Sequence, residues 1–530
     1  IADVNGISRR AIDEFSTRRR QIEAHLAARG QHSARAAQFA TYATRQAKDA
    51  DANPAWLLPV WQRRAAEVGL TDEALTGVLG RSPAIEAPAP GSAAAAQLYR
   101  WLASPEGLTA KVSTFGEREV IKAICNALPS GGNVTQVVKL AEGFLTSAHV
   151  VALQSGQPTA VIRRADGTVV GADAEERAWT TPEMLGVEAR MIARAVAREN
   201  DGAGVTDERA VDAAIDGRTL SPEQEQMVRT VCSSGRGVEV VEGVAGSGKT
   251  YALAAAHQAW KSSGRQVVGC SLAARAAKHL EEDTGILSTT LDRLLADLDR
   301  QHRVLDARTV VVVDESAMVG TRKIAWLLAL AEKANAEVVL VGDPHQLPEI
   351  DAGGAFRGLR SRLGAAQLTD NRRQAASWER GALAELRHGD TRAALDTYLT
   401  RERIHEAPSD SAVREELVAA WRADRRSGGV ALMVAARLRD VDDLNRRARA
   451  ALQTDGSLGP DELILDGRAY CVGDQVLALH NDYRLGILNG THAAVDDIDH
   501  DRSLLLLRCE DGTSIDLPFR YAAEGHLTHG

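Results

Sequence analysis

Aromatic residues, cysteines and long apolar runs are all scarce in this chain of 530 residues. Aromatic side chains make up 4% of it, so the sequence alone nominates no residue that would stack on nucleic-acid bases. Its 5 cysteines are scattered and show no metal-ligand spacing, which suits a reducing cytosol. No apolar run approaches the length of a membrane span, and no signal peptide is recognisable. We therefore expect a cytoplasmic protein without membrane insertion.

The chain also lacks an excess of positive charge. Its formal net charge is −9, so composition does not indicate a nucleic-acid partner, which must be argued from local features. The length predicts three or four domains, each able to bury a core. The first residue is Ile1 and the chain opens in helical sequence, so we expect an interior piece of a longer polypeptide.

The most informative motif is a glycine loop in the middle of the chain. It fits the pattern G-x-x-x-x-G-K-[ST] at every fixed position and lies between a β-branched run, 238–242, and a predicted helix, 251–261. Strand, loop and helix place backbone N–H groups and the positive helix end against phosphates. Lys249 would neutralise the β- and γ-phosphates, and Thr250 would hold Mg²⁺. The predicted phosphate-binding residues are Gly243, Ala245, Gly246, Ser247, Gly248, Lys249, Thr250 and Tyr251.

An acidic pair follows a second β-branched run, 309–314. Asp314, at the end of the predicted strand, is placed to hold Mg²⁺, usually through water. Glu315 is placed to act as base for the water that attacks the γ-phosphate. An exposed Asp-Glu pair alone would indicate nothing about function. Because this pair follows a predicted buried strand and lies after the glycine loop in the sequence, a catalytic role is favoured over a solvated surface pair.

Three further side chains complete the predicted nucleotide site. Gln346 follows the predicted strand 337–342 and is a candidate sensor of the γ-phosphate. Arg373 is a candidate for stabilising transition-state charge, with a solvated or DNA-facing basic patch as the alternative. Gln224 lies ahead of the first strand, and its amide can recognise adenine, which would make the nucleotide ATP. A simple helix cap is the alternative for Gln224.

From residue 220 onward, predicted strands and helices alternate, as a parallel α/β sheet requires. Two of the strands are continuous apolar runs, typical of strands covered on both faces. Each ends in an acid or a glycine at its carboxyl end, where ligands bind in such sheets. The predicted strands are 238–242, 266–271, 309–314 and 337–342.

Composition and pattern divide the chain into five predicted regions. Helices and a hairpin in the second quarter suggest a winged-helix-like unit, and a second α/β unit is predicted to start near 429–435. Short strands and tight turns at about 461–520 suggest a small β-barrel inserted into it. The regions are 1–80, helical; 81–111, a linker; 112–200, the winged-helix-like unit and a connecting helix; 201–395, the ATPase domain; and 396–530, the second α/β unit.

Taken in order, these segments resemble the motifs of superfamily 1 helicases of the RecD-like kind. The barrel sequence, 470–490, resembles the SH3-like insertion of that group. The resemblance implies an α/β fold with a RecA-like P-loop NTPase parallel sheet and a partial second RecA-like unit. The matching segments are 220–224 (Q motif), 243–250 (motif I), 271–277 (motif Ia), 314–318 (motif II), 342–347 (motif III) and 368–374 (motif IV).

The flanking sequence resembles TraA/TraI-type (MobF) conjugative relaxases. The resemblance lies in residues 15–19, which are similar to the segment after the nicking domain, and in residues 179–185. The catalytic tyrosines and the histidine triad of a relaxase do not occur here, so we expect no DNA nicking by this piece. Residues 526–530 resemble the lead into motif V, and the chain is expected to stop before motifs V and VI.

The resemblance implies an ATP-dependent 5′→3′ DNA helicase or translocase of a conjugative relaxase, which uses ATP and Mg²⁺ to unwind plasmid DNA during transfer. Its implied partners are single-stranded DNA and the conjugative secretion and relaxosome machinery. A non-translocating ATP- or DNA-binding or docking fragment is one alternative, and a RecD-like repair helicase is another. Candidate DNA-backbone contacts, for which a solvated helix face is an equal explanation, are Arg437, Arg439, Arg446, Arg447 and Arg449.

Overall fold

The computed structural model describes residues 11, 15, 54–71, 74–76, 87–128, 132–153, 161–163, 169–171, 177–428 and 431–529. The chain forms two compact units, Ala84–Arg403 and Ile1–Pro83 together with Ile404–Gly530. Helix α4 (Pro54–Glu67) confirms part of the predicted N-terminal helical region. The helices predicted before residue 54 lie outside the described residues. Among the helices that are described, none has the length and apolar character needed to cross a membrane.

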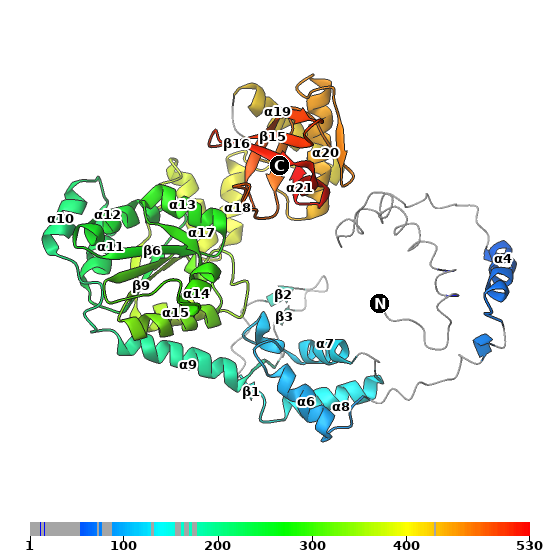
Figure 1. Ribbon diagram of the computed structural model, residues 1–530, viewed down its shortest axis with the longest axis horizontal. Helices are drawn as coiled ribbons and strands as arrows, with labels where there is room; N and C mark the ends of the chain where they lie inside the picture. Colours follow the sequence, from blue (N-terminus) through cyan, green and yellow to red (C-terminus); the bar gives the residue numbers. More distant parts are fainter. Residues whose placement is uncertain are drawn as a thin grey trace. The chain divides into compact units, whose positions relative to one another are not determined.

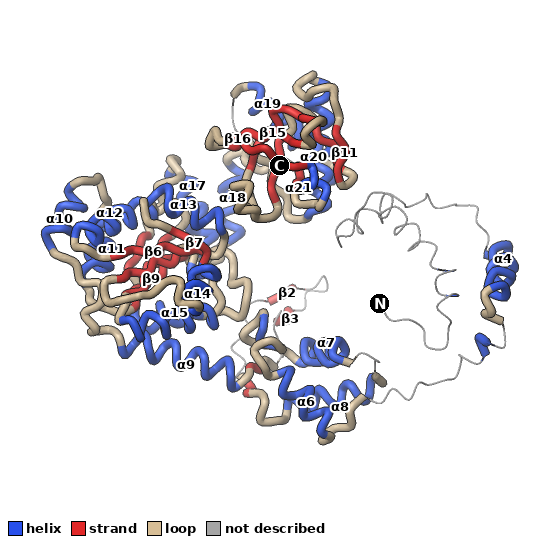
Figure 2. Tube along the Cα trace, viewed as in Figure 1, coloured by secondary structure: helices blue, strands red, loops and turns tan. Residues whose placement is uncertain are grey.

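A six-stranded parallel sheet forms the centre of the unit Ala84–Arg403 (Figure 1; Figure 2). The strand order is β10-β5-β9-β8-β6-β7, and every neighbouring pair is parallel. All four predicted strands are confirmed, whereas the two edge strands are too short to show a sequence period. The strands are β5 (Val238–Gly243), β6 (Gln266–Ser271), β7 (Ser288–Thr290), β8 (Thr309–Val313), β9 (Glu337–Gly342) and β10 (Ala366–Leu368).

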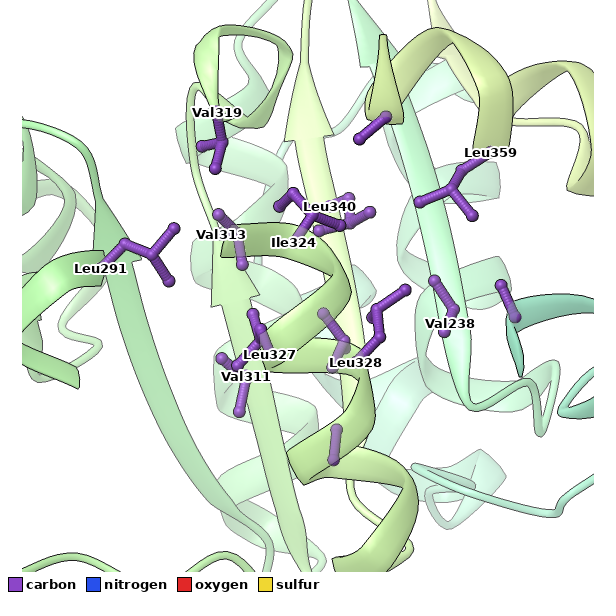
Figure 3. Close-up of a cluster of buried hydrophobic side chains, with 14 of the residues drawn as sticks. Val238, Leu291, Val311, Val313, Val319, Ile324, Leu327, Leu328, Leu340 and Leu359 are labelled. Carbon is purple, nitrogen blue, oxygen red and sulfur yellow. The ribbon is translucent and has the colours of Figure 1, made fainter. Parts of the chain in front are cut away.

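Helices cover both faces of this sheet (Figure 1). Along β8, Val310 and Val312 pack on one face with Trp260, and Val311 and Val313 pack on the other with Leu327 (Figure 3). The apolar runs are therefore buried on both sides. The first face carries α10 (Glu208–Asp216), α11 (Pro222–Ser233), α12 (Lys249–Ser262) and α13 (Ala274–Thr284); the second carries α9 (Pro182–Ala197), α14 (Leu291–Asp299), α15 (Thr321–Ala334) and α16 (Ala355–Leu363).

A smaller helical region precedes α9. The linker predicted over 81–111 is wrong for residues 93–110, which form α6 and η1. Alanine favours the helical conformation, Ser92 caps α6 by accepting from Ala95 N, and Leu102 is buried beside Phe144. The elements are α6 (Ala93–Leu102), η1 (Leu108–Ala110), α7 (Glu117–Ala127), α8 (Val134–Leu145), the pair β1 (Val151–Ala152) and β4 (Trp179–Thr180), and the pair β2 (Val161–Arg163) and β3 (Val169–Gly171).

The C-terminal part, from residue 404, combines helices with a five-stranded antiparallel sheet of order β16-β15-β14-β13-β17. Four of its strands confirm the short strands predicted within 461–520. The elements are α19 (Asp410–Arg426), α20 (Leu438–Thr454), β11 (Leu463–Leu465), β12 (Arg468–Tyr470), β13 (Gln475–Ala478), β14 (His492–Asp499), β15 (Leu504–Cys509), β16 (Ser514–Pro518), α21 (Phe519–Ala523) and β17 (Leu527–His529).

Residues 431–435, near the predicted start of the second α/β unit, form no strand. An apolar run forms a buried parallel strand only beside strand partners. The described residues after 404 contain antiparallel strand pairs alone. Leu432 and Val434 are accordingly 70% and 79% exposed. No second parallel sheet is therefore seen in this described part of the chain.

Two buried carboxyl groups lie on neighbouring strands at the amino-terminal side of the central sheet. Glu337 begins β9 and is 1% exposed, and Glu239 belongs to β5. Burial raises the pKa of Glu337 well above its ordinary value of 4.5, and the charge of Glu239 raises it further. The guanidinium groups of Arg265 and Arg198 oppose this shift. The folded state therefore favours the neutral form of Glu337.

We expect Glu337→Gln to remove a pH dependence of stability. The folded protein holds the Glu337 proton to higher pH than the unfolded chain does, so the free energy of unfolding falls as pH rises from 4.5 through the raised pKa. The slope is at most about 1.4 kcal/mol per pH unit. Urea titrations over this range should show a flatter profile for Glu337→Gln. An unchanged profile would contradict the assignment, and Glu282→Gln on α13 is the exposed control.

Candidate active site

Residues 243–250 form a tight loop between β5 and α12. Gly246 and Gly248 have φ angles of 79° and 78°, which side chains other than glycine rarely adopt. A Cβ atom on Gly248 would lie 2.5 Å from Nε2 of Gln224, and one on Gly243 would lie 2.6 Å from Cγ of Lys249. Glycine at these positions therefore lets the backbone approach its neighbours closely. The loop ends at the amino terminus of α12, whose N–H groups and dipole favour a phosphate.

Lys249 begins α12 and bends back toward the loop. Its Nζ donates to the carbonyl oxygens of Gly243, at 2.9 Å, and of Val244, at 3.3 Å. The Ser247 hydroxyl is buried and has no hydrogen-bond partner among the described residues. Thr250 lies in the first turn of the helix and is half-buried. The loop thus presents an ammonium group, a hydroxyl and an unsatisfied buried oxygen, which fit a phosphate and its cation.

Asp314 and Glu315 directly follow β8. Asp314 is 9% exposed, and its Oδ1 accepts no hydrogen bond from any described residue. Burial raises the pKa of Asp314 to about 6, and the charge of Glu315 adds to the rise, while the ammonium of Lys249 opposes it. Glu315 adopts a left-handed backbone with φ of 52°. An unsatisfied buried carboxylate near Lys249 suits a hard divalent cation or its bound water.

The turn after β9 carries Gln346. Its Nε2 donates over 3.2 Å to Oδ2 of Asp343, which is 1% exposed. The same oxygen accepts from Nη1 of Arg387, at 2.8 Å, at the end of α17 (Ser377–Arg387). Burial alone would raise the pKa of Asp343, but the hydrogen bond from Arg387 and that from His345 N hold it below its usual range. Gln346 is therefore anchored on an ionised carboxylate.

Arg373 lies against the phosphate loop. The N–H of Arg372 donates to Gly246 O at 2.9 Å, and a Cβ atom on Gly246 would lie 2.6 Å from Cβ of Arg373. Directly after β10, Thr369 N and Oγ1 donate to the carboxylate of Glu223 on α11. The segment carrying Arg373 is thus fixed to both the loop and α11, and a role of Arg373 at the γ-phosphate stays a prediction.

Gln224 closes a capping box and also contacts the phosphate loop. Its Oε1 accepts from Ser221 N at 3.0 Å, as the helix-cap alternative requires. Its Nε2 donates to Ser247 O at 3.0 Å, a contact that spacing along the chain does not reveal. These two contacts fix the amide beside the loop. Recognition of adenine by Gln224 stays a prediction.

The predicted site residues gather at the carboxyl edge of the sheet. Ala245 is an exposed member of the loop, and Tyr251 is partly exposed beneath the guanidinium of Arg218, 5.5 Å from the ring centroid. Sequence analysis missed Arg387, which lies 44 positions after Asp343. Its only signal is a cation in the last turn of an amphipathic helix, which is common on solvated faces.

We expect Gly246→Ala to weaken nucleotide binding at least about tenfold. The new Cβ atom meets Arg373, and a φ of +79° disfavours alanine by about 1–2 kcal/mol. Gly264→Ala is a matched control, because Gly264 has a φ of +71° and no atom lies within 4 Å of its added Cβ. Titration with a fluorescent nucleoside diphosphate measures the effect. Equal binding by both variants would contradict the packing of Arg373 on the loop.

Four of the five arginines proposed for DNA contact pair with carboxylates, and two of these pairings, those of Arg449 and Arg447, reach beyond α20. Arg449 Nε lies 3.2 Å from Asp474, and its Nη1 lies 3.1 Å from Glu462. Arg447 pairs with Asp443 of the same helix at 2.8 Å, and its Nη1 lies 3.1 Å from Glu415 of α19. Both arginines attach α20 to neighbouring structure, which the spacing of the arginines along the helix does not indicate.

Two family models match separate parts of the chain. Residues 219–409, which include the loop, both acidic residues and Arg373, match the model described as an AAA domain. Residues 1–68 match the TrwC relaxase model and lie largely outside the described residues. The pairing of a nucleotide-binding domain with relaxase sequence is the one that the motifs predict.

Relatives in bacteria support the same assignment. A probable conjugal transfer protein TraA of Sinorhizobium fredii is 31% identical over 80% of this chain, which covers 38% of that protein. A conjugal transfer protein TraA of Rhizobium radiobacter is 37% identical over 59% of this chain and 29% of that protein. The ATP-dependent RecD2 DNA helicase of Deinococcus radiodurans is 33% identical over 55% of this chain and 40% of that protein. This chain thus spans less than half the length of each.

Among solved structures, Bacteroides Pif1 bound to single-stranded DNA is 20% identical, with a TM-score of 0.37 over 56% of this chain and 74% of that one. This overlap is too low to carry an argument. The parallel sheet and the AAA-domain match establish the P-loop fold instead. The resemblance to TraA/TraI proteins and RecD-like helicases is confirmed by the sequence relatives.

Proposed function

We propose that this chain, a relative of TraA conjugal transfer proteins and RecD-type helicases, hydrolyses Mg-ATP to move along and unwind DNA. One observation carries the proposal. Asp314 and Ser247 keep buried oxygens without partners among the described residues, at the sheet edge that carries the glycine loop and Lys249. Unsatisfied buried oxygens are costly, and a phosphate with its cation would satisfy them.

The residues divide the work of phosphoryl transfer. Thr250 and Asp314 would hold Mg²⁺, which when bound supplies charge that neutralises the β- and γ-phosphates. Glu315 would accept a proton from the attacking water. Lys249 would leave its loop carbonyls for the phosphates, while Gln346 and Arg373 would contact the γ-phosphate from two other strand ends. Gln224 would lie near the adenine.

Single-stranded DNA is the proposed track, and the conjugative secretion and relaxosome machinery are the proposed partners. The RecD2 relative is an ATP-dependent DNA helicase, which supports a DNA track, and the TraA relatives are conjugal transfer proteins, which supports the proposed partners. We place the protein in the cytoplasm, because no disulfide joins its five cysteines, all of which lie in described residues.

A candidate base-stacking residue emerges from the C-terminal unit. Tyr483 is 61% exposed at the tip of a short turn closed by the bridge between Asp482 and Ile487, and exposed Arg484 follows it. We expect Tyr483→Ala to weaken single-stranded DNA binding by about 1–3 kcal/mol, because it removes one stacking ring. Tyr483→Phe, which keeps the ring, should bind like the wild type in a fluorescence-anisotropy titration. Equal affinity of all three proteins would rule out stacking there.

Steady-state ATP turnover, with and without single-stranded DNA, tests the proposed function. We expect turnover that needs Mg²⁺, rises with DNA and disappears in Lys249→Ala. Unwinding of a duplex with a 5′ tail and of one with a 3′ tail then tests polarity. If Mg-ATP does not bind in a Lys249-dependent way, the assignment of the site is wrong.

The rival function is a nucleotide- or DNA-binding fragment that does not translocate. It is distinguished by the same experiment, because such a fragment binds Mg-ATP through Lys249 without DNA-stimulated turnover. A repair helicase is the second rival. The match of residues 1–68 to relaxase sequence favours conjugation over repair.

A further inference from the structure

Four charged side chains form a continuous series of ion pairs beside the glycine loop. Arg360 Nε lies 2.6 Å from Glu242 Oε2, and Glu242 Oε1 lies 3.5 Å from Arg387 Nη2. Arg387 Nη1 in turn lies 2.8 Å from Asp343 Oδ2. Both carboxylates are buried, and Arg387 is mostly buried. Arg387 is therefore the member of the series that contacts both acids.

The two acids lie at the carboxyl ends of neighbouring strands, displaced by one residue from each other. Glu242 is the residue immediately before Gly243, the first glycine of the loop. Asp343 immediately follows Gly342, which pairs in register with Glu242 across β5 and β9. Two adjacent buried carboxylates repel each other unless a cation lies between them. Arg387 supplies that cation. Glu242 keeps a second arginine partner in Arg360, whereas Asp343 pairs with no other cation among the described residues.

The acid at the β9 end also holds the proposed γ-phosphate sensor. Asp343 Oδ2 accepts from both Gln346 Nε2 and Arg387 Nη1, while Oδ1 accepts from His345 N. Because one oxygen receives both donors, displacement of Arg387 changes the anchor of Gln346. Arg387 does not act on phosphate directly, since both of its terminal nitrogens already face carboxylates.

We propose that Arg387 is a positioning residue that sets the preference of this site for a nucleoside triphosphate over a diphosphate. The inference rests on the function proposed above. The α- and β-phosphates depend on loop N–H groups, Lys249 and Thr250, none of which Arg387 contacts. The γ-phosphate depends in addition on Gln346, whose anchor Arg387 shares. Loss of Arg387 therefore acts on the third phosphate selectively.

The pairing also links the nucleotide site to the helices that follow. Arg387 is the last residue of α17, which packs against α18 (Thr391–Thr400). A cation in the last turn of a helix is favoured by the helix dipole, so the guanidinium is held from its own helix as well as by the acids. A shift of Gln346 toward a phosphate would thus act on α17 through Asp343 and Arg387.

Affinities for Mg-ADP and for a slowly hydrolysed ATP analogue, with steady-state kinetics, test this inference in Arg387→Ala, Arg387→Lys and Asp343→Asn. We expect Arg387→Ala to bind ADP within about twofold of the wild type and the triphosphate at least about tenfold more weakly. Its kcat should fall about 10- to 100-fold, more than KM rises. Arg387→Lys should recover part of the preference. Exposed Arg392→Ala on α18 is the control.

The outcomes separate this inference from the proposed function. If the wild type binds neither nucleotide, the function itself fails. If the wild type prefers the triphosphate and every Arg387 and Asp343 variant keeps that preference, the positioning role alone fails. Equal losses of affinity for ADP and for the triphosphate would show that Arg387 is a purely structural residue, and would also overturn the proposed positioning role. Should Arg387→Ala not fold, Asp343→Asn, which keeps the side-chain shape, carries the same expectation.

Discussion

Glu315→Gln is expected to lower ATP turnover by about 10²- to 10⁴-fold while Mg-ATP binding is retained, because the amide cannot accept the proton of the attacking water. The backbone of Glu315 is left-handed and directly follows the buried Asp314. The two neighbouring acids therefore occupy different environments, one buried at the strand end and one beyond it. This separation supports different roles, with Asp314 toward the cation and Glu315 toward water.

Pre-steady-state measurements distinguish this loss from a loss of binding. Glu315→Gln should bind a fluorescent ATP analogue like the wild type and show a slow single turnover, whereas Lys249→Ala should lose affinity itself. Glu332→Gln, a partly exposed acid on α15 that pairs with Arg194, is the matched control and should leave turnover unchanged. Turnover by Glu315→Gln within about twofold of the wild type would place the base elsewhere.

The parts of the site that follow one another along the chain could be predicted from sequence. The glycine loop, Asp314, Glu315 and Gln346 each lie within four residues of the end of a β-branched run, and parallel strands bring such ends to one edge. The order of strands and motifs along the chain therefore predicts that these residues lie at the same edge of the sheet. The short strands of the C-terminal sheet were predictable for the same reason, because alternation and tight turns are local signals.

Contacts between distant segments could not be predicted in this way. Arg387 contacts Glu242 across 145 positions, and its helix shows only an ordinary amphipathic pattern. The helix at 93–102 could not be predicted, because a segment rich in alanine and polar residues suits a linker as well as a helix. The burial of Leu102, which stabilises the helix, depends on residues distant in sequence. The apolar run near 432 is the opposite case, because it forms no strand although its composition suits one. A buried strand needs strand partners, and residues nearby in sequence do not supply them.

Arg198 is a further residue whose role depends on distant partners. It follows α9 and is 3% exposed, with Nη2 donating to Ala336 O at 2.9 Å and Nε pairing with Asp201 at 2.6 Å. Its own carbonyl oxygen accepts from Gly237 N at 2.8 Å. It therefore joins α9 to the beginnings of β5 and β9. Its charge also opposes the raised pKa of Glu337.

Arg198→Met is expected to lower the free energy of unfolding by about 3–5 kcal/mol, because it removes a buried cation and leaves Ala336 O and Asp201 without their partner. The cost should shrink in the Glu337→Gln background at pH values high enough to ionise Glu337, because only the ionised carboxylate interacts with the cation, giving a coupling of about 0.5–3 kcal/mol there. Urea unfolding of the four proteins measures this, and hydrogen exchange in 238–243 and 337–342 localises it. Additive losses would mean that Arg198 stabilises the sheet through its carbonyl contacts alone, independently of Glu337.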